Sequence, residues 1–261
     1  MHHRAPMLMS AVVLMSSLIL GFAPSKTNAL VTLPTPCTAT TLVRDAHPLT
    51  AKVVNVSLVN QDVNAVDDFT GAPCDIGAYY DNGLASSIVN SSVHGSIYFA
   101  VVARIAGTTL DMQDSSAFEV GDKPTHTGTQ HGVAIAFIEG AQGSVARTEV
   151  YNYQKNGFAA DGPGTSVVIS DSRFHGSGPT PIIAQNGVQF SRGAVGAVTG
   201  TTMELHEYTG CSQQDAQQTG CTPFVSAGLL IFDSPAKSID RKNNLYRNND
   251  FNVLNVQSPG P

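Results

Sequence analysis

The sequence predicts an all-β solenoid of stacked coils, each made of three short strands. Ile88–Ser96 and Ile169–Ser177 both begin with Ile, have Ser at the fourth position and end in His-Gly-Ser, which marks an internal repeat. The first apolar residue of each copy is predicted to recur along the chain at Ile88, Met112, Val145, Ile169, Val198 and Ile239. Two of these gaps equal 24 residues. Such a period, with Gly, Asn, Asp and Ser turns between alternating strands, is typical of a solenoid.

Residues 1–29 are expected to form a secretory signal peptide. Basic residues precede an apolar run, Met7–Ala23, and small residues suited to cleavage follow at Thr27–Ala29. That run is short for a membrane anchor, and we expect no membrane span after its removal. The segment carries Arg4 and Lys26 and no acid, so its loss takes the net charge from -6 to -8. This balance disfavours a nucleic-acid partner and fits a secreted, periplasmic or cell-surface protein.

Four cysteines follow the predicted signal peptide. An even number in an exported chain favours disulfides over metal ligands, and three pairings are possible. Cys211 and Cys221 bracket a short polar loop, so we favour Cys211–Cys221 together with Cys37–Cys74. The spacing lacks a Cys-x2-Cys metal motif, and we expect no metal or other cofactor.

Residues 30–84 are expected to form an N-terminal cap and the first coil, and residues 85–261 the remaining coils. One strand of each coil begins with or near Gly: Tyr98–Ala103, Gly132–Phe137, Gly157–Ala160, Gly187–Phe190 and Gly228–Phe232. The predicted inward side chains are Ile88, Val93, Val133, Ile135, Val145, Val150, Ile169, Phe174, Val188, Phe190, Val198 and Met203. No window beyond residue 85 has the apolar spacing of a long amphipathic helix.

Three insertions interrupt the coils just before the Gly-initiated strand, at residues 119–131, 175–186 and 204–227. Because they fall at the same point of the repeat, stacking is expected to place them side by side on one face.

Two stretches resemble known families. Val167–Gly176, followed by Gly187–Phe190, resembles right-handed parallel β-helix proteins of the pectate-lyase-like superfamily, and with the period it predicts about six to seven coils. Cys74–Tyr79 resembles the Cys-Asp-Ile-Gly-Ala-Tyr motif of exported choice-of-anchor and polymorphic outer-membrane β-helix proteins, although Tyr80 replaces the Glu and the motif precedes the coils. The first resemblance implies a polysaccharide-binding groove walled by the insertions.

Charged residues are predicted at the ends of the Gly-initiated strands: Arg104, Glu139, Asp161, Arg192 and Asp233. With coils about 4.8 Å apart, Asp161, Arg192 and Asp233 would be vertical neighbours. Arg192 could then neutralise a uronate carboxylate between two acids. Alternatively, the charges form an exposed ion-pair ladder that contributes little stability.

Further candidates accompany this ladder. His175 and His206 are the acid or base candidates because imidazole titrates near neutrality and both lie in or beside the insertions. Arg104, Glu139, Gln189 and Tyr208 are the substrate-binding candidates. The predicted function is binding, with cleavage or modification, of a polysaccharide or cell-surface glycan by a polyuronate lyase-like or hydrolase-like groove. The alternative is a non-catalytic surface or matrix β-helix protein.

Overall fold

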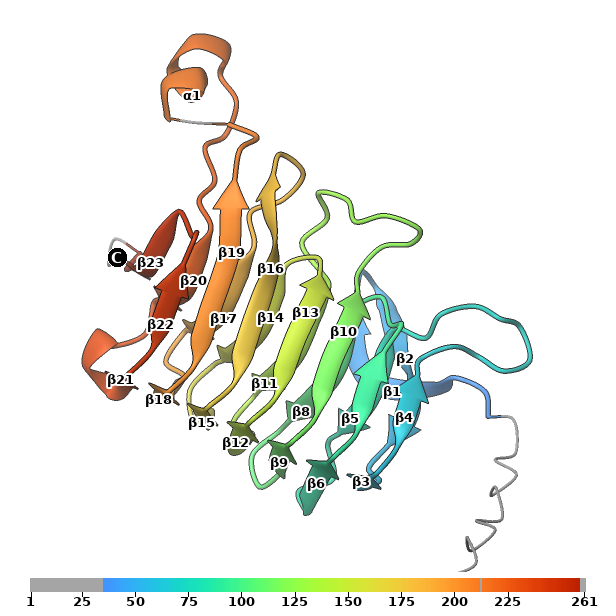
Figure 1. Cartoon of the computed structure of the whole chain (residues 1–261). Coiled ribbons are helices and arrows are strands. Elements are labelled where there is room, and N and C mark those ends of the chain that lie inside the picture. Colours follow the sequence, from blue (N-terminus) through green and yellow to red (C-terminus); the bar gives the residue numbers. More distant parts are fainter. Residues whose placement is uncertain (1–34, 212, 259–261) are drawn as a thin grey trace, which may run out of the picture. The chain divides into compact units, whose positions relative to one another are not determined.

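The computed structural model describes residues 35–211 and 213–258 as a parallel β-helix of seven three-strand coils followed by one further strand (Figure 1). The predicted signal peptide lies outside the described residues. Within them, no helix is long and apolar enough to cross a bilayer.

Each coil contributes one strand to each of three sheets. Sheet A consists, in spatial order, of β1 (Thr38–Arg44), β2 (His47–Val54), β5 (Ile76–Tyr80), β8 (Phe99–Arg104), β11 (Val133–Ile138), β14 (Asn156–Asp161), β17 (Asn186–Ser191), β20 (Ala227–Phe232) and β23 (Phe251–Val256). Its strands are parallel except β1, which pairs antiparallel with β2 and covers that edge of the sheet.

The other two sheets have seven strands each. Sheet B consists of β3 (Leu58–Val59), β6 (Ala85–Val89), β9 (Thr109–Gln113), β12 (Gln142–Ala146), β15 (Ser166–Ser170), β18 (Val195–Thr199) and β21 (Ile239–Lys242). Sheet C consists of β4 (Asp62–Asn64), β7 (Ser92–His94), β10 (Ser116–Val120), β13 (Glu149–Tyr153), β16 (Arg173–Thr180), β19 (Thr202–Tyr208) and β22 (Leu245–Arg247).

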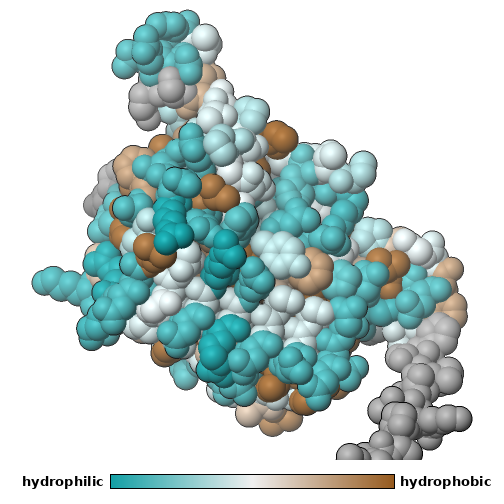
Figure 2. All heavy atoms as spheres, in the orientation of Figure 1, coloured by the Kyte–Doolittle hydropathy of each residue, from teal (hydrophilic) through white to brown (hydrophobic). Residues whose placement is uncertain are grey.

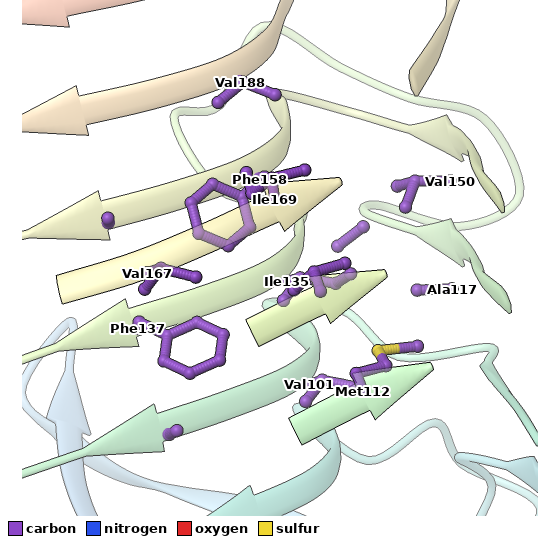
Figure 3. Packing of buried hydrophobic residues seen from close by; sticks show 14 of the residues in the cluster. Val101, Met112, Ala117, Ile135, Phe137, Val150, Phe158, Val167, Ile169 and Val188 are labelled. Carbon is purple, nitrogen blue, oxygen red and sulfur yellow. The ribbon is translucent and has the colours of Figure 1, made fainter. Parts of the chain in front are cut away.

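The core lies inside the coils, where equivalent side chains stack in columns (Figure 3). Sheet A contributes Ile135, Phe158 and Val188 at paired positions, and all three are fully buried. Eleven of the twelve predicted inward residues belong to this core. Val133 was predicted wrongly: it is half-buried and packs against a separate apolar cluster of sheet A.

A break in strand alternation explains the position of Val133. The next residue, Ala134, also faces inward beside Ile135, so the two-residue alternation is interrupted at this point. Gly157 and Gly187 occupy the same place in later coils. A Cβ at Gly157 would lie 2.8 Å from the carbonyl oxygen of Gly187, so the coils approach too closely there for a larger residue.

The corner between sheets B and C holds a ladder of hydrogen bonds between coils. Its hydroxyl members donate to the carbonyl two residues earlier, and these are Ser91, Ser115, Thr148, Ser172 and Thr201. The same side chains accept from the preceding coil: the backbone N–H of Thr148 donates to Ser172, and that of Ser172 donates to Thr201. Asn244 continues the ladder in the last coil. This corner therefore holds successive coils in register.

Five of the six predicted repeat markers pair with one another on adjacent coils. Ile88, Met112, Val145, Ile169 and Val198 form one column of sheet B. The sixth assignment was wrong, because Val198 pairs with Arg241 while Ile239 pairs with Gly196. The turn before β21 includes a short 3-10 helix, Ala236–Ser238, which changes the spacing. Ile239 is still buried, in the neighbouring inward column.

All three predicted insertions connect sheet C to sheet A. The connections follow β10, β16 and β19, and all rise on the same side in Figure 1. The longest contains a polar helix, α1 (Gln213–Thr219), and is closed by the Cys211–Cys221 disulfide. A second disulfide, Cys37–Cys74, ties the first described residues to the segment just before β5. These are the two pairings favoured from the sequence.

Candidate functional site

A groove crosses the outer face of sheet A. It encloses about 610 Å³, and its lining includes Arg44 and Asp45 at the β1–β2 turn and residues 129–131 of the first insertion. We call it the sheet A groove. It extends from Tyr98, just before β8, to Arg192, just after β17. These two ends are three coils apart, or about 14 Å along the stack at about 4.8 Å per coil.

The floor of the groove is formed by outward residues of β11, β14 and β17. Small side chains, among them Ala136, Ala159 and Ser191, leave the space open. Amide groups line it as well: Asn156 Nδ2 donates to Gln189 Oε1 at 3.0 Å, and Gln189 Nε2 donates to Ser191 Oγ at 2.6 Å. The predicted substrate-binding residue Gln189 therefore lies in the groove. Hydroxyl and amide groups of this kind suit a polyhydroxylated ligand.

The Arg192 end contains part of the predicted charged ladder. Arg192 donates to Asp161 Oδ2 at 2.6 Å, and its side chain is 63% exposed. Asp161 Oδ1 is buried and has no hydrogen bond within the described chain. Stacking of the coils thus brings these two predicted residues together. The exposed guanidinium of Arg192 is accessible to a ligand.

The rest of the charged ladder is not continuous with this pair. Asp233 accepts hydrogen bonds from Ser258, at 2.5 Å from its backbone nitrogen and 2.7 Å from its Oγ. The backbone hydrogen bond is the main cause that lowers the pKa of Asp233. Among the described residues Arg192 has an ion pair with Asp161 alone, and its charge contributes to lowering the pKa of Asp233 on the next coil. Arg104 and Glu139 form their own pair at 2.6 Å, outside the groove lining.

The Tyr98 end was largely missed by sequence reasoning. Tyr98 donates to Asp45 Oδ2 at 2.5 Å, and its ring lies 4.6 Å from that of His131. His131 Nε2 lies 2.7 Å from Asp122 Oδ1. Asp122 and His131 fall in one insertion, which is a local signal. Asp45, in contrast, meets Tyr98 across 53 residues with no repeat pattern to indicate it.

His175 and His206 lie away from the groove and on opposite sides of sheet C. His175 faces outward, where its Nδ1 donates to Glu204 Oε1 at 3.2 Å. His206 is fully buried, and burial is the main cause that lowers its pKa to about 4. Leu205 has a positive φ of 63°, which reverses the alternation so that the residue after it faces inward. The expectation that both histidines lie on loops above Arg192 was therefore wrong.

Hydrogen bonds fix the protonation of His206. Its Nδ1 lies 2.8 Å from Asn249 Oδ1, which accepts only, so Nδ1 carries the proton. Its Nε2 then accepts from the hydroxyl of Tyr153, also fully buried. This neutral histidine is part of the core. Tyr208 likewise lies elsewhere, with its ring 6.2 Å from that of Phe224 in the longest insertion.

A second depression, of about 730 Å³, runs along the corner of sheets B and C. Its polar groups bond to one another: Arg147 donates to Asp114 at 2.6 Å, and Ser92 donates to Asp62. None of the three insertions contributes to its lining. The sheet A groove, which is lined in part by the first insertion and contains two exposed guanidinium groups, is the stronger candidate site.

No family model, curated protein or solved structure matches this chain. Among the described residues, no group of three or more His, Cys, Asp or Glu side chains is placed to hold a metal ion. The Cys-Asp-Ile-Gly-Ala-Tyr motif takes part in the first coils: Cys74 is in a disulfide, and Asp75 Oδ2 accepts from the backbone of Thr50 at 2.8 Å.

Proposed function

We propose that this protein binds an acidic polysaccharide, with uronate units, in the sheet A groove. The observation that carries the proposal is the groove's extent: it crosses three coils over a floor of small and amide side chains, with a guanidinium at each end. Arg44 lines one end and Arg192 the other. Arginine pairs well with carboxylate, so the two ends suit separate uronates of one chain.

An extracellular setting agrees with this proposal. Two disulfides in a chain of this size are characteristic of oxidising compartments, where glycans are exposed. Secretion, or retention at the cell surface or in the periplasm, would bring the groove to such a ligand.

The test is binding of polygalacturonate and alginate oligosaccharides by calorimetry, with Arg192→Ala as the variant. Loss of one charge-assisted contact should weaken binding about tenfold or more. Arg147→Ala is the matched control, because Arg147 forms a similar exposed ion pair with Asp114 at the corner of sheets B and C. Equal affinity for all three proteins would remove Arg192 from the site. Absence of binding by the native protein would favour the non-catalytic surface or matrix role.

A further inference from the structure

A buried glutamine anchors the first insertion, the one that lines the sheet A groove. We infer that Gln154 is a positioning residue for ligand binding, which holds residues 129–131 at the groove and does not itself touch the ligand. The inference rests on the proposed binding of a uronate chain, and it adds the residue that keeps part of the binding surface in place.

Gln154 lies at the base of the insertion. It follows β13, precedes β14 and is fully buried. Gly121, near the start of the insertion, and Gly132, just after its end, both pack against this side chain. A Cβ at either glycine would lie 2.5 Å from Gln154 Cβ, and both have a positive φ, of 138° and 82°, that a larger residue rarely adopts. The chain therefore enters and leaves the insertion in contact with Gln154.

Both ends of the Gln154 amide bond to the insertion. Its Oε1 accepts from the backbone N–H groups of Asp122, at 2.9 Å, and Thr127, at 3.2 Å. Its Nε2 donates to the carbonyl oxygen of Thr129 at 2.9 Å, to Thr129 Oγ1 at 2.6 Å and to Asp122 Oδ2 at 3.2 Å. Glutamine supplies a donor and an acceptor on one side chain, and this position uses both.

Asp122 extends these contacts to the groove. Its Oδ2 accepts from the hydroxyls of Thr127 and Thr129, and its Oδ1 lies 2.7 Å from His131 Nε2. Burial would raise the pKa of Asp122, but hydrogen bonds from these three side chains lower it overall. The carboxylate therefore stays ionised and fixes the imidazole of His131. Residues 129–131 line the groove, so the contacts of Gln154 decide where that part of the lining lies.

A loop that is ordered before binding favours affinity. Ligand association then does not have to restrict the conformational freedom of the loop. An apolar side chain at position 154 would leave the backbone N–H groups of Asp122 and Thr127 without these acceptors. Buried polar groups without partners are costly, so the insertion would shift toward conformations in which they reach water. The ligand would then have to order the insertion at the expense of affinity.

Gln185 provides a comparison in the next coil. It directly precedes β17, which pairs with β14, and it is also buried. Its Oε1 accepts from the backbone N–H of Ser177 at 2.8 Å, and its Nε2 donates to the carbonyl oxygen of Tyr153. It therefore holds the second insertion, residues 175–186. The described part of the groove lining includes no residue of that insertion, so the two glutamines differ in whether their insertion reaches the groove.

The test compares Gln154→Met with Gln185→Met by calorimetric binding of polygalacturonate and alginate oligosaccharides, and by hydrogen exchange without ligand. Gln154→Met should weaken binding about tenfold or more, and exchange within residues 119–131 should become about tenfold faster or more. Gln185→Met should accelerate exchange within residues 175–186 and leave affinity within about threefold of the native value. Both variants should melt at a lower temperature, so stability is measured beside affinity.

Gln154→Glu tests the hydrogen bonds without a change of shape. At about pH 8 the new carboxylate has no N–H to donate and faces the Asp122 carboxylate, so we expect affinity about tenfold or more below that of the native protein. At about pH 5 a carboxyl group that is buried beside another carboxylate binds a proton and can donate again. Affinity should then return to within about threefold of the native protein at the same pH. Lys123, His126 and His131 are unchanged in every variant, so this ratio removes their own titration.

The outcomes separate this inference from the proposed function. Equal affinities in Gln154→Met and Gln185→Met, whether lowered or native, would overturn the inference and leave the proposed function standing. Unchanged exchange within residues 119–131 of Gln154→Met would also overturn it. If Gln154→Met does not fold, a failure of Gln154→Glu to recover at low pH does the same. Absence of binding by the native protein would overturn both proposals.

Discussion

The outer faces of sheets A and C are built by the same coils and differ in what stands on them. On sheet A the outward positions of β11 and β14 carry Ala136 and Ala159, which leave a groove. On sheet C the equivalent column carries rings: His94 stacks on Phe118 at 4.6 Å, and Phe118 on Tyr151 at 4.8 Å.

Several charged groups on the outer face of sheet C bond to one another. Arg173 bonds to Glu204 and lies 3.6 Å from Glu149, and His175 also bonds to Glu204. Figure 2, which views this side of the molecule, shows a largely hydrophilic surface with isolated apolar patches. Large side chains that repeat at the coil spacing pack against one another. A column of small ones beside the first insertion leaves an open groove, so side-chain size in the outward columns separates a packed face from the face proposed to bind a ligand.

Filling the groove should produce the largest effect. Ala159→Trp puts an indole on the floor of the groove, and we expect affinity for polyuronate oligosaccharides to fall by about a hundredfold or more, because the ligand loses its space. Ala197→Trp, on the outer face of sheet B, is the matched control. Calorimetry and melting curves of both variants test this. Ligand binding retained in Ala159→Trp would place the site elsewhere.

The inner side of sheet C should respond to pH. Burial lowers the pKa of His206 to about 4, against 6.5 when unfolded. Between these pH values the imidazole is protonated in the unfolded chain and neutral in the folded chain. The contribution of His206 to the free energy of unfolding therefore has its full value above about pH 6.5. It decreases as the pH falls toward 4, by about 3 kcal/mol in total.

The measurement is urea unfolding between pH 7.5 and 4.5. His206→Gln should be less stable at pH 7.5 but should lose most of the slope, while His47→Gln, at an exposed position, keeps it. His175 and Glu204 are the charged groups that act on His206 most directly. A slope that persists in His206→Gln would assign the pH dependence to them.

The stacked rings of sheet C should affect stability and leave binding unchanged. Phe118→Ala removes a half-buried ring held between two others, and we expect a loss of about 2 kcal/mol in the free energy of unfolding. Phe224→Ala, at a ring that is 52% exposed in the longest insertion, should cost less than about 0.5 kcal/mol. A change of ligand affinity in Phe118→Ala would show that sheet C takes part in binding.

Features that repeat with the coil were predictable from the sequence, and features that depend on breaks in the repeat were not. The core column containing Ile135 and the Arg192–Asp161 pair follow from alternation and stacking. His206 was misplaced because a positive φ at Leu205 reverses the alternation, and no composition signal marks a leucine for that conformation. The contact of Asp45 with Tyr98 depends on the β1–β2 turn, which lies outside the repeat.

The hydroxyl ladder at the corner of sheets B and C limits how the length of the chain can change. A slip of one residue would leave a row of backbone N–H groups at Ser91, Thr148, Ser172 and Thr201 without acceptors, so chain length can change there only by whole coils. Deleting or duplicating one complete coil would shorten or lengthen the sheet A groove by a single step of about 4.8 Å. That step is close to the length of one sugar ring, so under the proposed function the number of coils would set how many sugar units the groove holds.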